Sequence, residues 1–256
     1  MKALKTDLSI FDRFEFANQP VGVKYLFKKP AEIEQLDKAM SFCEMVKEAQ
    51  QRGTPFYMSK ENENCAGKGV LGMEEIGPMA ITGGLGEKLE IFEDGRANGN
   101  LIYNVFQSFP PIRKGSINYV VFAPLDKLTF EPDLLILLAA PGQAEIALRA
   151  MSYKTGELWK SQTSGVFACA SLLVYPYQTG NVNYTITGMS FGMKVKEIFP
   201  PGWVLISIPY QKLPAIIQNL KEMKWVLPSY TDGREKFLER DRRIKAELAR
   251  ELKEGL

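Results

Sequence analysis

The feature that most constrains the fold is a continuous apolar run in the middle of the chain. Residues 134–140 are all leucine, isoleucine or alanine, and Pro141 and Gly142 follow directly. A strand with one solvent-facing side alternates apolar and polar residues, so a run without polar positions is typical of a strand buried on both faces. The sequence therefore predicts such a strand within an α/β fold.

The two halves of the chain share an order of predicted elements. A strand at 21–27 in the first half corresponds to the apolar run of the second half, and residues 120–128 resemble residues 205–213, each with a proline that ends a strand. We therefore expect two diverged α/β repeats, 1–130 and 131–228, that pack about a pseudo-twofold axis. Chance similarity between two α/β segments is the alternative.

Two cysteines lie in helices at matching places of the two halves. Apolar residues at helical spacing predict a helix from about Ala31 that carries Cys43 on or beside its apolar face. The apolar stretch 166–174 predicts a buried helix that carries Cys169. If the halves pack about one axis, we expect these two thiols to converge near it.

A third cysteine begins a turn of small residues. The turn of Cys65, Ala66 and Gly67 corresponds to a turn of Ile186, Thr187 and Gly188 in the second half. The halves together therefore outline a four-cysteine site in which Ile186 stands at the fourth corner.

The last segment, residues 229–256, has a composition of its own. From Asp232 onward it is mostly Arg, Lys, Glu, Ala and Leu, with one narrow apolar stripe of Phe237, Ile244, Leu248 and Leu252. This pattern predicts a charged surface helix. The helix either packs along its own body or meets a partner, in a homo-oligomer or on a larger enzyme.

Charge and apolar content exclude several partners. Lysine plus arginine number 32 against 30 for aspartate plus glutamate, so we expect no nucleic-acid partner. No apolar run approaches the ~20 residues that span a bilayer, and the first residues lack the apolar region of a secretory signal. Three unpaired cysteines suit the reducing cytoplasm, where we expect the protein.

The chain contains no histidine. Catalytic Ser-His-Asp and Cys-His arrangements are thereby excluded, as are zinc, non-haem iron and haem sites with histidine ligands. Any general base must be a carboxylate, lysine, tyrosine or thiolate.

The cysteines are the candidate ligands that remain. Without histidine, thiolates suit an iron–sulfur cluster better than structural zinc, so Cys43, Cys65 and Cys169 are the predicted metal-binding and cofactor-binding residues. The alternative is that the cysteines are simply small buried residues, which fits Cys43 and Cys169 on apolar helices. Cys65 fits that alternative least, because it lies between a polar loop and Gly67, where free N–H groups and the nearby Lys68 favour a thiolate.

Five short motifs lie in order along the chain: Pro20-Val21-Gly22-Val23-Lys24, Ser41-Phe42-Cys43, Cys65-Ala66-Gly67, Phe167-Ala168-Cys169-Ala170 and Pro176-Tyr177-Gln178-Thr179-Gly180. Together, over roughly residues 15–220, they resemble the uncharacterised family catalogued as domain of unknown function 169. The family occurs in bacteria and archaea, many of them anaerobes, and has no settled activity. Many members carry a further cysteine in the turn before Gly188, where this chain has Ile186.

Three functions follow as hypotheses. The first is a cytoplasmic protein that binds an iron–sulfur cluster or a small ligand between its two halves, with a role in anaerobic or redox metabolism that the resemblance implies. The second is a cluster-free module that binds an organic anion with the turns at Gly67 and Gly188. The third is an accessory subunit whose charged tail docks onto a larger enzyme. Whether the chain is an enzyme stays open at this point.

Overall fold

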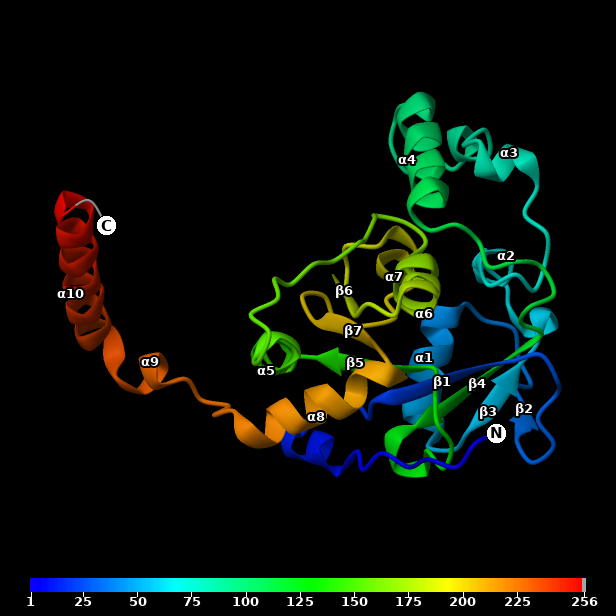
Figure 1. The fold of residues 1–256 in the computed structure, drawn as a ribbon. Helices are drawn as coiled ribbons and strands as arrows, with labels where there is room; N and C mark the ends of the chain where they lie inside the picture. The colour runs from blue at the N-terminus through cyan, green and yellow to red at the C-terminus, as the bar shows by residue number, and fades with distance from the viewer. Residues whose placement is uncertain (255–256) are drawn as a thin grey trace.

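One sheet organises the chain. The computed structural model describes residues 1–254, and they contain a seven-stranded mixed sheet of order β2-β3-β4-β1-β5-β7-β6 (Figure 1). Strands β2 and β3 run parallel, and the other neighbouring pairs are antiparallel. The strands are β1 (Val21–Leu26), β2 (Glu34–Gln35), β3 (Phe56–Met58), β4 (Tyr119–Pro124), β5 (Leu134–Ala139), β6 (Asn183–Ile186) and β7 (Val204–Pro209). The predicted α/β fold class is confirmed.

Strand β5 is the apolar run of the sequence, and all six of its residues are buried. Leu134, Ile136 and Leu138 belong to the core on one face of the sheet. The residues between them, such as Leu135 and Leu137, belong to the core on the other face. Full burial of one leucine contributes roughly 1.5–3 kcal/mol, so this strand is a major source of stability.

Helices cover both faces of the sheet. On one face lie α1 (Phe42–Arg52), the π-helical turn η5 (Ala170–Val174), α6 (Tyr175–Thr179) and α7 (Phe191–Val195). The other face carries η1 (Ser9–Phe14), α5 (Pro141–Ser152) and α8 (Leu213–Glu222). The cysteines of the sequence analysis all lie on the α1 side.

The pairing pattern is the same on the two sides of the central pair β1 and β5. Strand β1 pairs with β4, which pairs with β3; strand β5 pairs with β7, which pairs with β6. Both β4 and β7 end in proline and continue into a short 3-10 helix, η4 (Leu125–Lys127) or η6 (Tyr210–Lys212). One continuous sheet thus contains both halves. Their descent from one repeated unit, and the domain boundaries at 130 and 228, stay predictions.

The helix expected from about Ala31 begins later. Residues 34–35 form the edge strand β2, and the backbone N–H of Leu36 donates to Tyr57 at 2.8 Å. Helix α1 starts only at Phe42, after Ser41, whose N–H donates to the Glu44 carboxylate at 2.8 Å. This capping arrangement fixes the helix start. The apolar residues of the preceding segment have helical spacing, but Leu36 is buried while it pairs with the edge of the sheet, not as part of a helix.

A small helical extension stands on the same side of the sheet as α1 (Figure 1). A glycine-rich stretch contains the short helices α3 (Pro78–Ile81) and η3 (Gly86–Lys88). They pack on the longer helix α4 (Gly95–Ser108). At the start of α4 the side chain of Asp94 accepts a hydrogen bond from the N–H of Arg96 at 2.8 Å.

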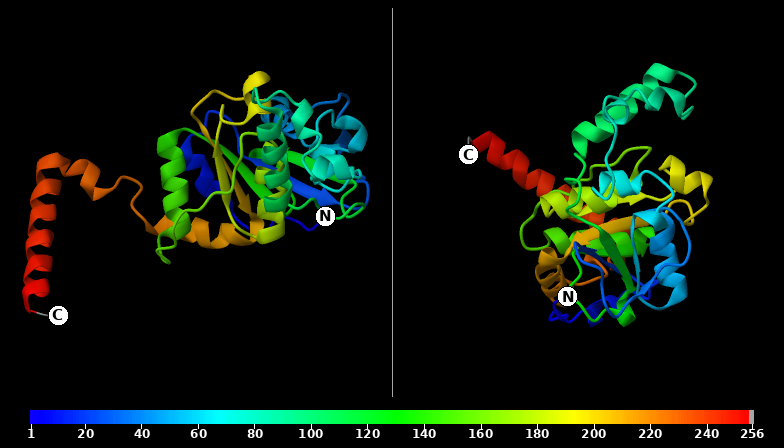
Figure 2. Two further views of the ribbon diagram at one scale, coloured as in Figure 1. Left: turned by 90° about the horizontal axis from the view of Figure 1, so that it is seen from above. Right: turned by 90° about the vertical axis from the view of Figure 1, so that its right-hand side faces the viewer.

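The charged tail forms the predicted helix, α10 (Gly233–Glu254), preceded by α9 (Pro228–Thr231). Residues 255–256, which the predicted tail segment included, lie outside the described residues. Helix α10 projects away from the sheet and its helices (Figures 1 and 2). The interpretation that it packs along its own body is therefore wrong. Among the described helices, none is long and apolar enough to cross a membrane.

Candidate functional site

The three cysteines of the chain line one cavity. Cys43 comes from α1 and Cys65 from the loop before α2 (Gly67–Val70). Cys169 comes from the helix of residues 168–179, which lies on the same face of the sheet as α1. The cavity has a volume of about 220 Å3, and all three side chains contribute to its wall. The structure therefore brings together the three residues that the sequence selects as ligands.

Cys43 is fixed by the capped start of α1. It is the second residue of that helix, directly after Phe42, whose ring is buried in the core. The Glu44 carboxylate that caps the helix also pairs with the Lys196 ammonium, at 2.8 Å. Lys196 lines the same cavity, so this ion pair ties α1 to the second half of the chain beside Cys43.

Cys169 is also the second residue of a helix, which runs over 168–179 and includes the π turn. Phe167, just before the helix, has φ 53°, a left-handed conformation that costs a non-glycine residue roughly 1–3 kcal/mol. Its ring packs edge-on against Phe106 of α4 at 5.4 Å between centroids. Left-handed backbone and π turns are both frequent at functional sites.

Cys65 lies in a loop that a buried carboxylate holds. Glu63 is only 2% exposed, and its side chain accepts hydrogen bonds from the backbone N–H of Cys65 at 3.0 Å and of Lys68 at 3.2 Å. Gly67 is needed here for close packing, because an added Cβ would lie 2.2 Å from the Phe42 ring. The loop therefore rests against the start of α1, and Cys65 itself is exposed.

The electrostatics of the cavity keep the two inner thiols protonated. Burial, with a smaller effect from the nearby Cys65, raises the pKa of Cys43 to about 12. Burial and then the neighbouring Cys43 and Cys65 raise the pKa of Cys169 well above its ordinary value. A bound cation reverses this preference, because metal binding deprotonates a thiol.

Two charged groups at the cavity have shifted pKa values as well. Burial raises the pKa of Glu63, although the N–H groups of Lys68, Cys65 and Gly67 act against the shift. Burial is the largest single effect on Lys196 and lowers its pKa, but the hydrogen bond to Glu44 and the charges of Glu44, Cys65 and Cys43 together outweigh it, so the pKa is raised overall. Lys196 therefore supplies a stable positive charge beside the thiols.

The rest of the cavity wall is mainly apolar. Its apolar side chains include Leu89 and Ile91 from the helical extension, Val166 and Phe167 before the second helix, and Phe191 of α7. Such a wall excludes water and lowers the local dielectric around whatever the cavity holds. The arrangement can bind a thiolate-ligated group or a small apolar molecule.

Neither Gly67 nor Gly188 itself lines this cavity, although Cys65 and Ala66 of the first turn do. Gly67 packs behind it against Phe42. Gly188, with φ +87°, lies with Ile186 on a neighbouring cavity of about 880 Å3, and the two cavities share Met193 and Ile198. Ile186, at the fourth corner of the site outlined by the sequence, thus borders the neighbouring cavity and not the cysteine cavity.

The described residues contain no compact ligand set for a single metal ion. Among residues 1–254 there is no group of three or more cysteine, aspartate or glutamate side chains close enough together to hold one ion. A tetrahedral ion with metal–sulfur bonds of about 2.3 Å needs its thiolates within about 4 Å of one another. A cluster spreads its thiolate ligands over several iron atoms and so uses donors that lie farther apart.

The sequence alone did not indicate Glu63 or Lys196. Glu63 belongs to a polar loop that the sequence predicts to be solvent-exposed. Only its position two residues before Cys65 points to a role at the site. Lys196 follows a short helix far along the chain, and no motif distinguishes it from the other lysines. Both become candidates only when the fold places them at the thiols.

Comparison with known proteins agrees with the family resemblance. The family model DUF169, described as "Uncharacterised ArCR", matches residues 10–219. The chain is also 26% identical over 200 residues to the uncharacterized protein MJ0308 of Methanocaldococcus jannaschii, which covers 77% of this chain and 83% of that protein. No solved structure matches. The match over most of its length shows that the chain belongs to the DUF169 family.

Proposed function

We propose that this protein binds an iron–sulfur cluster in the cysteine cavity, with Cys43, Cys65 and Cys169 as thiolate ligands. The observation that carries the proposal is the convergence of the three cysteines, which are 22 and 104 residues apart in the chain, on one cavity. If they were only small core residues, they would have no reason to share a wall.

The charges around the cavity set a condition for thiolate ligation. The raised pKa values of Cys43 and Cys169 mean that the thiolate forms need positive charge nearby. Iron supplies that charge when a cluster is bound, and Lys196 adds to it. The burial of the site and its apolar wall are properties that set the reduction potential of such clusters.

Three thiolates leave room for one further ligand. If three thiolates held a four-iron cluster, one iron would be open to a water, a carboxylate or a substrate atom. The Glu63 carboxylate is already engaged by the N–H groups of Cys65 and Lys68. We assign it a positioning role for the Cys65 loop. A redox role in a reducing cytoplasm is the metabolic setting that this chemistry suits.

The test is the metal content of protein purified without oxygen. We expect iron and acid-labile sulfide in near-stoichiometric amounts and a visible absorption band, all strongly reduced in C43S and C169S. Each single variant leaves two thiols, so we expect C65S to lose iron and sulfide as well. A colourless wild-type protein without iron would refute the proposal.

A second candidate function uses the same cavity without a metal. The apolar wall formed by Leu89, Ile91, Val166, Phe167 and Phe191, together with the lack of an ion-sized ligand group among the described residues, favours a small apolar ligand. This candidate predicts a colourless protein whose melting temperature rises with a suitable apolar compound. An F191A or V166A substitution would then abolish the shift, whereas C65S would leave it in place.

A further inference from the structure

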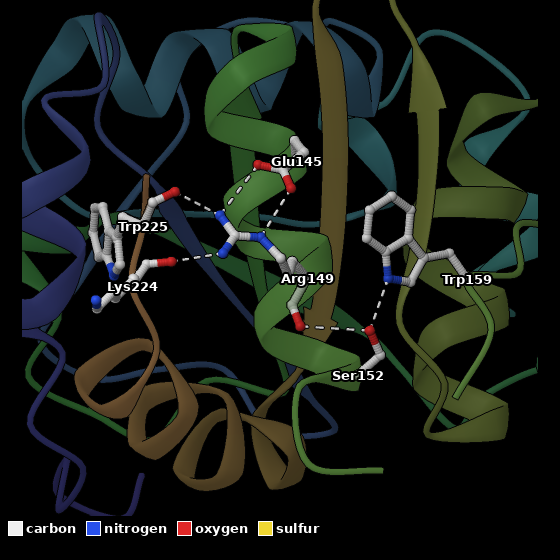
Figure 3. A network of polar contacts seen from close by, with 6 residues as sticks. All are labelled: Glu145, Arg149, Ser152, Trp159, Lys224 and Trp225. Atoms are coloured by element: carbon white, nitrogen blue, oxygen red, sulfur yellow. Dashed lines mark hydrogen bonds and ion pairs between the residues drawn. The ribbon is translucent and has the colours of Figure 1, made fainter. Parts of the chain in front are cut away.

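The C-terminal arm is anchored firmly at its base. The Arg149 guanidinium donates to the backbone carbonyls of Lys224 and Trp225, both at 2.6 Å, and pairs with Glu145 at 2.9 Å (Figure 3). The Trp225 ring packs against Phe14, with 4.5 Å between centroids, and the Arg13 guanidinium lies 4.3 Å from its centre. The chain is therefore held to the body up to Trp225, and α10 extends outward from this anchor (Figure 2).

One side of α10 is apolar and uncovered. Phe237, Ile244, Leu248 and Leu252 are 51%, 47%, 52% and 80% exposed. With 3.6 residues per turn these four side chains fall within about 80° of one another around the helix axis. An apolar stripe, interrupted by Asp241, on a helix that the body leaves uncovered is a surface for association.

A row of charges runs along one flank of this stripe. Lys236, Arg240 and Arg243 occupy it in the first half of the helix, and Glu247 and Glu251 occupy it in the second. Arg240 pairs with Asp232 at 2.7 Å. The other four form no ion pair within the described part of the chain. Lys236 with Arg240, and Glu247 with Glu251, are like charges four residues apart, which disfavours the isolated helix.

From this pattern we propose that α10 binds α10 of a second copy of this chain, in antiparallel orientation. Antiparallel pairing places Phe237 opposite the partner's Leu252, with Ile244 close to the twofold axis. In the same register Arg243 faces the partner's Glu247, and Arg240 faces the partner's Glu251. Each contact occurs twice, as in any twofold interface between identical surfaces.

The charge row also determines the orientation. In a parallel pair the charge row of one helix would face the other flank of its partner, which carries no matching row of opposite charges. The antiparallel pair instead neutralises the flank along its whole length. Asp241, which lies within the stripe between Phe237 and Ile244, is already neutralised by Lys245 at 2.7 Å. This inference is independent of the cysteine cavity and its occupant.

Sedimentation velocity of the full chain tests the proposal. We expect a concentration-dependent dimer for the wild type that E247K/E251K weakens about tenfold or more, since several ion pairs become repulsive contacts. K236E/R243E, which leaves the Arg240–Asp232 pair intact, weakens it similarly. E235K/E239K makes the same charge change on the opposite side of the helix and leaves dimerisation unchanged.

Mixing the two reversed variants is the decisive step. E247K/E251K has a basic flank throughout, and K236E/R243E has a mainly acidic flank, so each pairs with itself only weakly, whereas the two together form a heterodimer. Recovery of the dimer in the mixture supports the antiparallel helix pair. A wild-type chain that stays monomeric at about 100 μM, or reversed variants that dimerise like the wild type, would overturn it.

Discussion

Cys43 and Cys169 are each the second residue of a helix, and both helices begin at the same cavity over one face of the sheet. The positive end of a helix favours a thiolate, whereas burial favours the neutral thiol. In these two residues burial dominates, and both thiol pKa values are raised. The thiols therefore change state when a cation enters the cavity, which makes their protonation a useful probe of the site.

The first prediction concerns stability at alkaline pH. Because the folded-state pKa of Cys43 is about 12 against 9.0 for an ordinary thiol, the folded chain holds this proton more tightly than the unfolded chain. The stabilisation is complete below about pH 9 and decreases as pH rises toward 12, with a slope approaching ~1.4 kcal/mol per pH unit for each such thiol. Urea unfolding of the metal-free chain between about pH 8 and pH 11 measures this dependence.

C43S provides the control for that experiment. Lysine and tyrosine side chains titrate in the same range in both proteins, so the difference between the two pH profiles isolates the thiol. We expect a shallower decrease in C43S. Identical slopes for the wild type and C43S would contradict the raised pKa.

The second prediction concerns Gly67. A Cβ at this position would lie 2.2 Å from the Phe42 ring, so G67A forces the ring or the Cys65 loop to move and destabilises the fold by roughly 1–3 kcal/mol. G192A is the matched control, because Gly192 lines the cysteine cavity but an added Cβ there meets nothing within 4 Å. Chemical denaturation compares the two. Equal stability would show that the loop does not pack on Phe42.

The third prediction concerns the carboxylate of Glu63. E63A leaves the N–H groups of Cys65 and Lys68 without their acceptor and costs about 1–3 kcal/mol. E63Q retains one acceptor oxygen and removes the buried charge, so we expect a smaller loss. If the positioning role is correct, E63A also increases the rate at which iodoacetamide modifies Cys65. An unchanged modification rate in E63A would contradict the role of Glu63 in positioning the Cys65 loop.

The fourth prediction concerns the central strand. Leu137 is fully buried on the face away from the cysteines, and L137A should cost about 2–5 kcal/mol. L158A deletes the same side chain at a position that is 77% exposed and should change the stability by less than about 0.5 kcal/mol. Thermal unfolding of both variants checks the contrast. A small effect of L137A would mean that β5 is not covered on this face.

Parts of the fold could be predicted because one residue pattern dominated them. A run without polar residues is stable only where both faces of the strand are buried, so β5 was expected where the structure has it. The start of α1 was not predicted correctly, because the residues around Leu36 show helical spacing although they pair at the sheet edge. The capping by Ser41 and Glu44 decides that boundary, and the apolar pattern does not reveal it.

The site could be predicted only where the two halves resembled each other. That likeness predicted that Cys43, Cys65 and Cys169 come together, and all three line one cavity in the structure. Gly188 lies elsewhere, since its turn borders the adjacent cavity. Glu63 and Lys196 depend on contacts between segments far apart in the sequence, for which a single sequence gives no signal.

The most direct measurement is an anomalous difference map at the iron absorption edge, from crystals of protein prepared without oxygen. The account predicts iron density in the cysteine cavity, within bonding distance of the Sγ atoms of Cys43, Cys65 and Cys169. A cavity that contains no iron while the three thiols remain in place would contradict it.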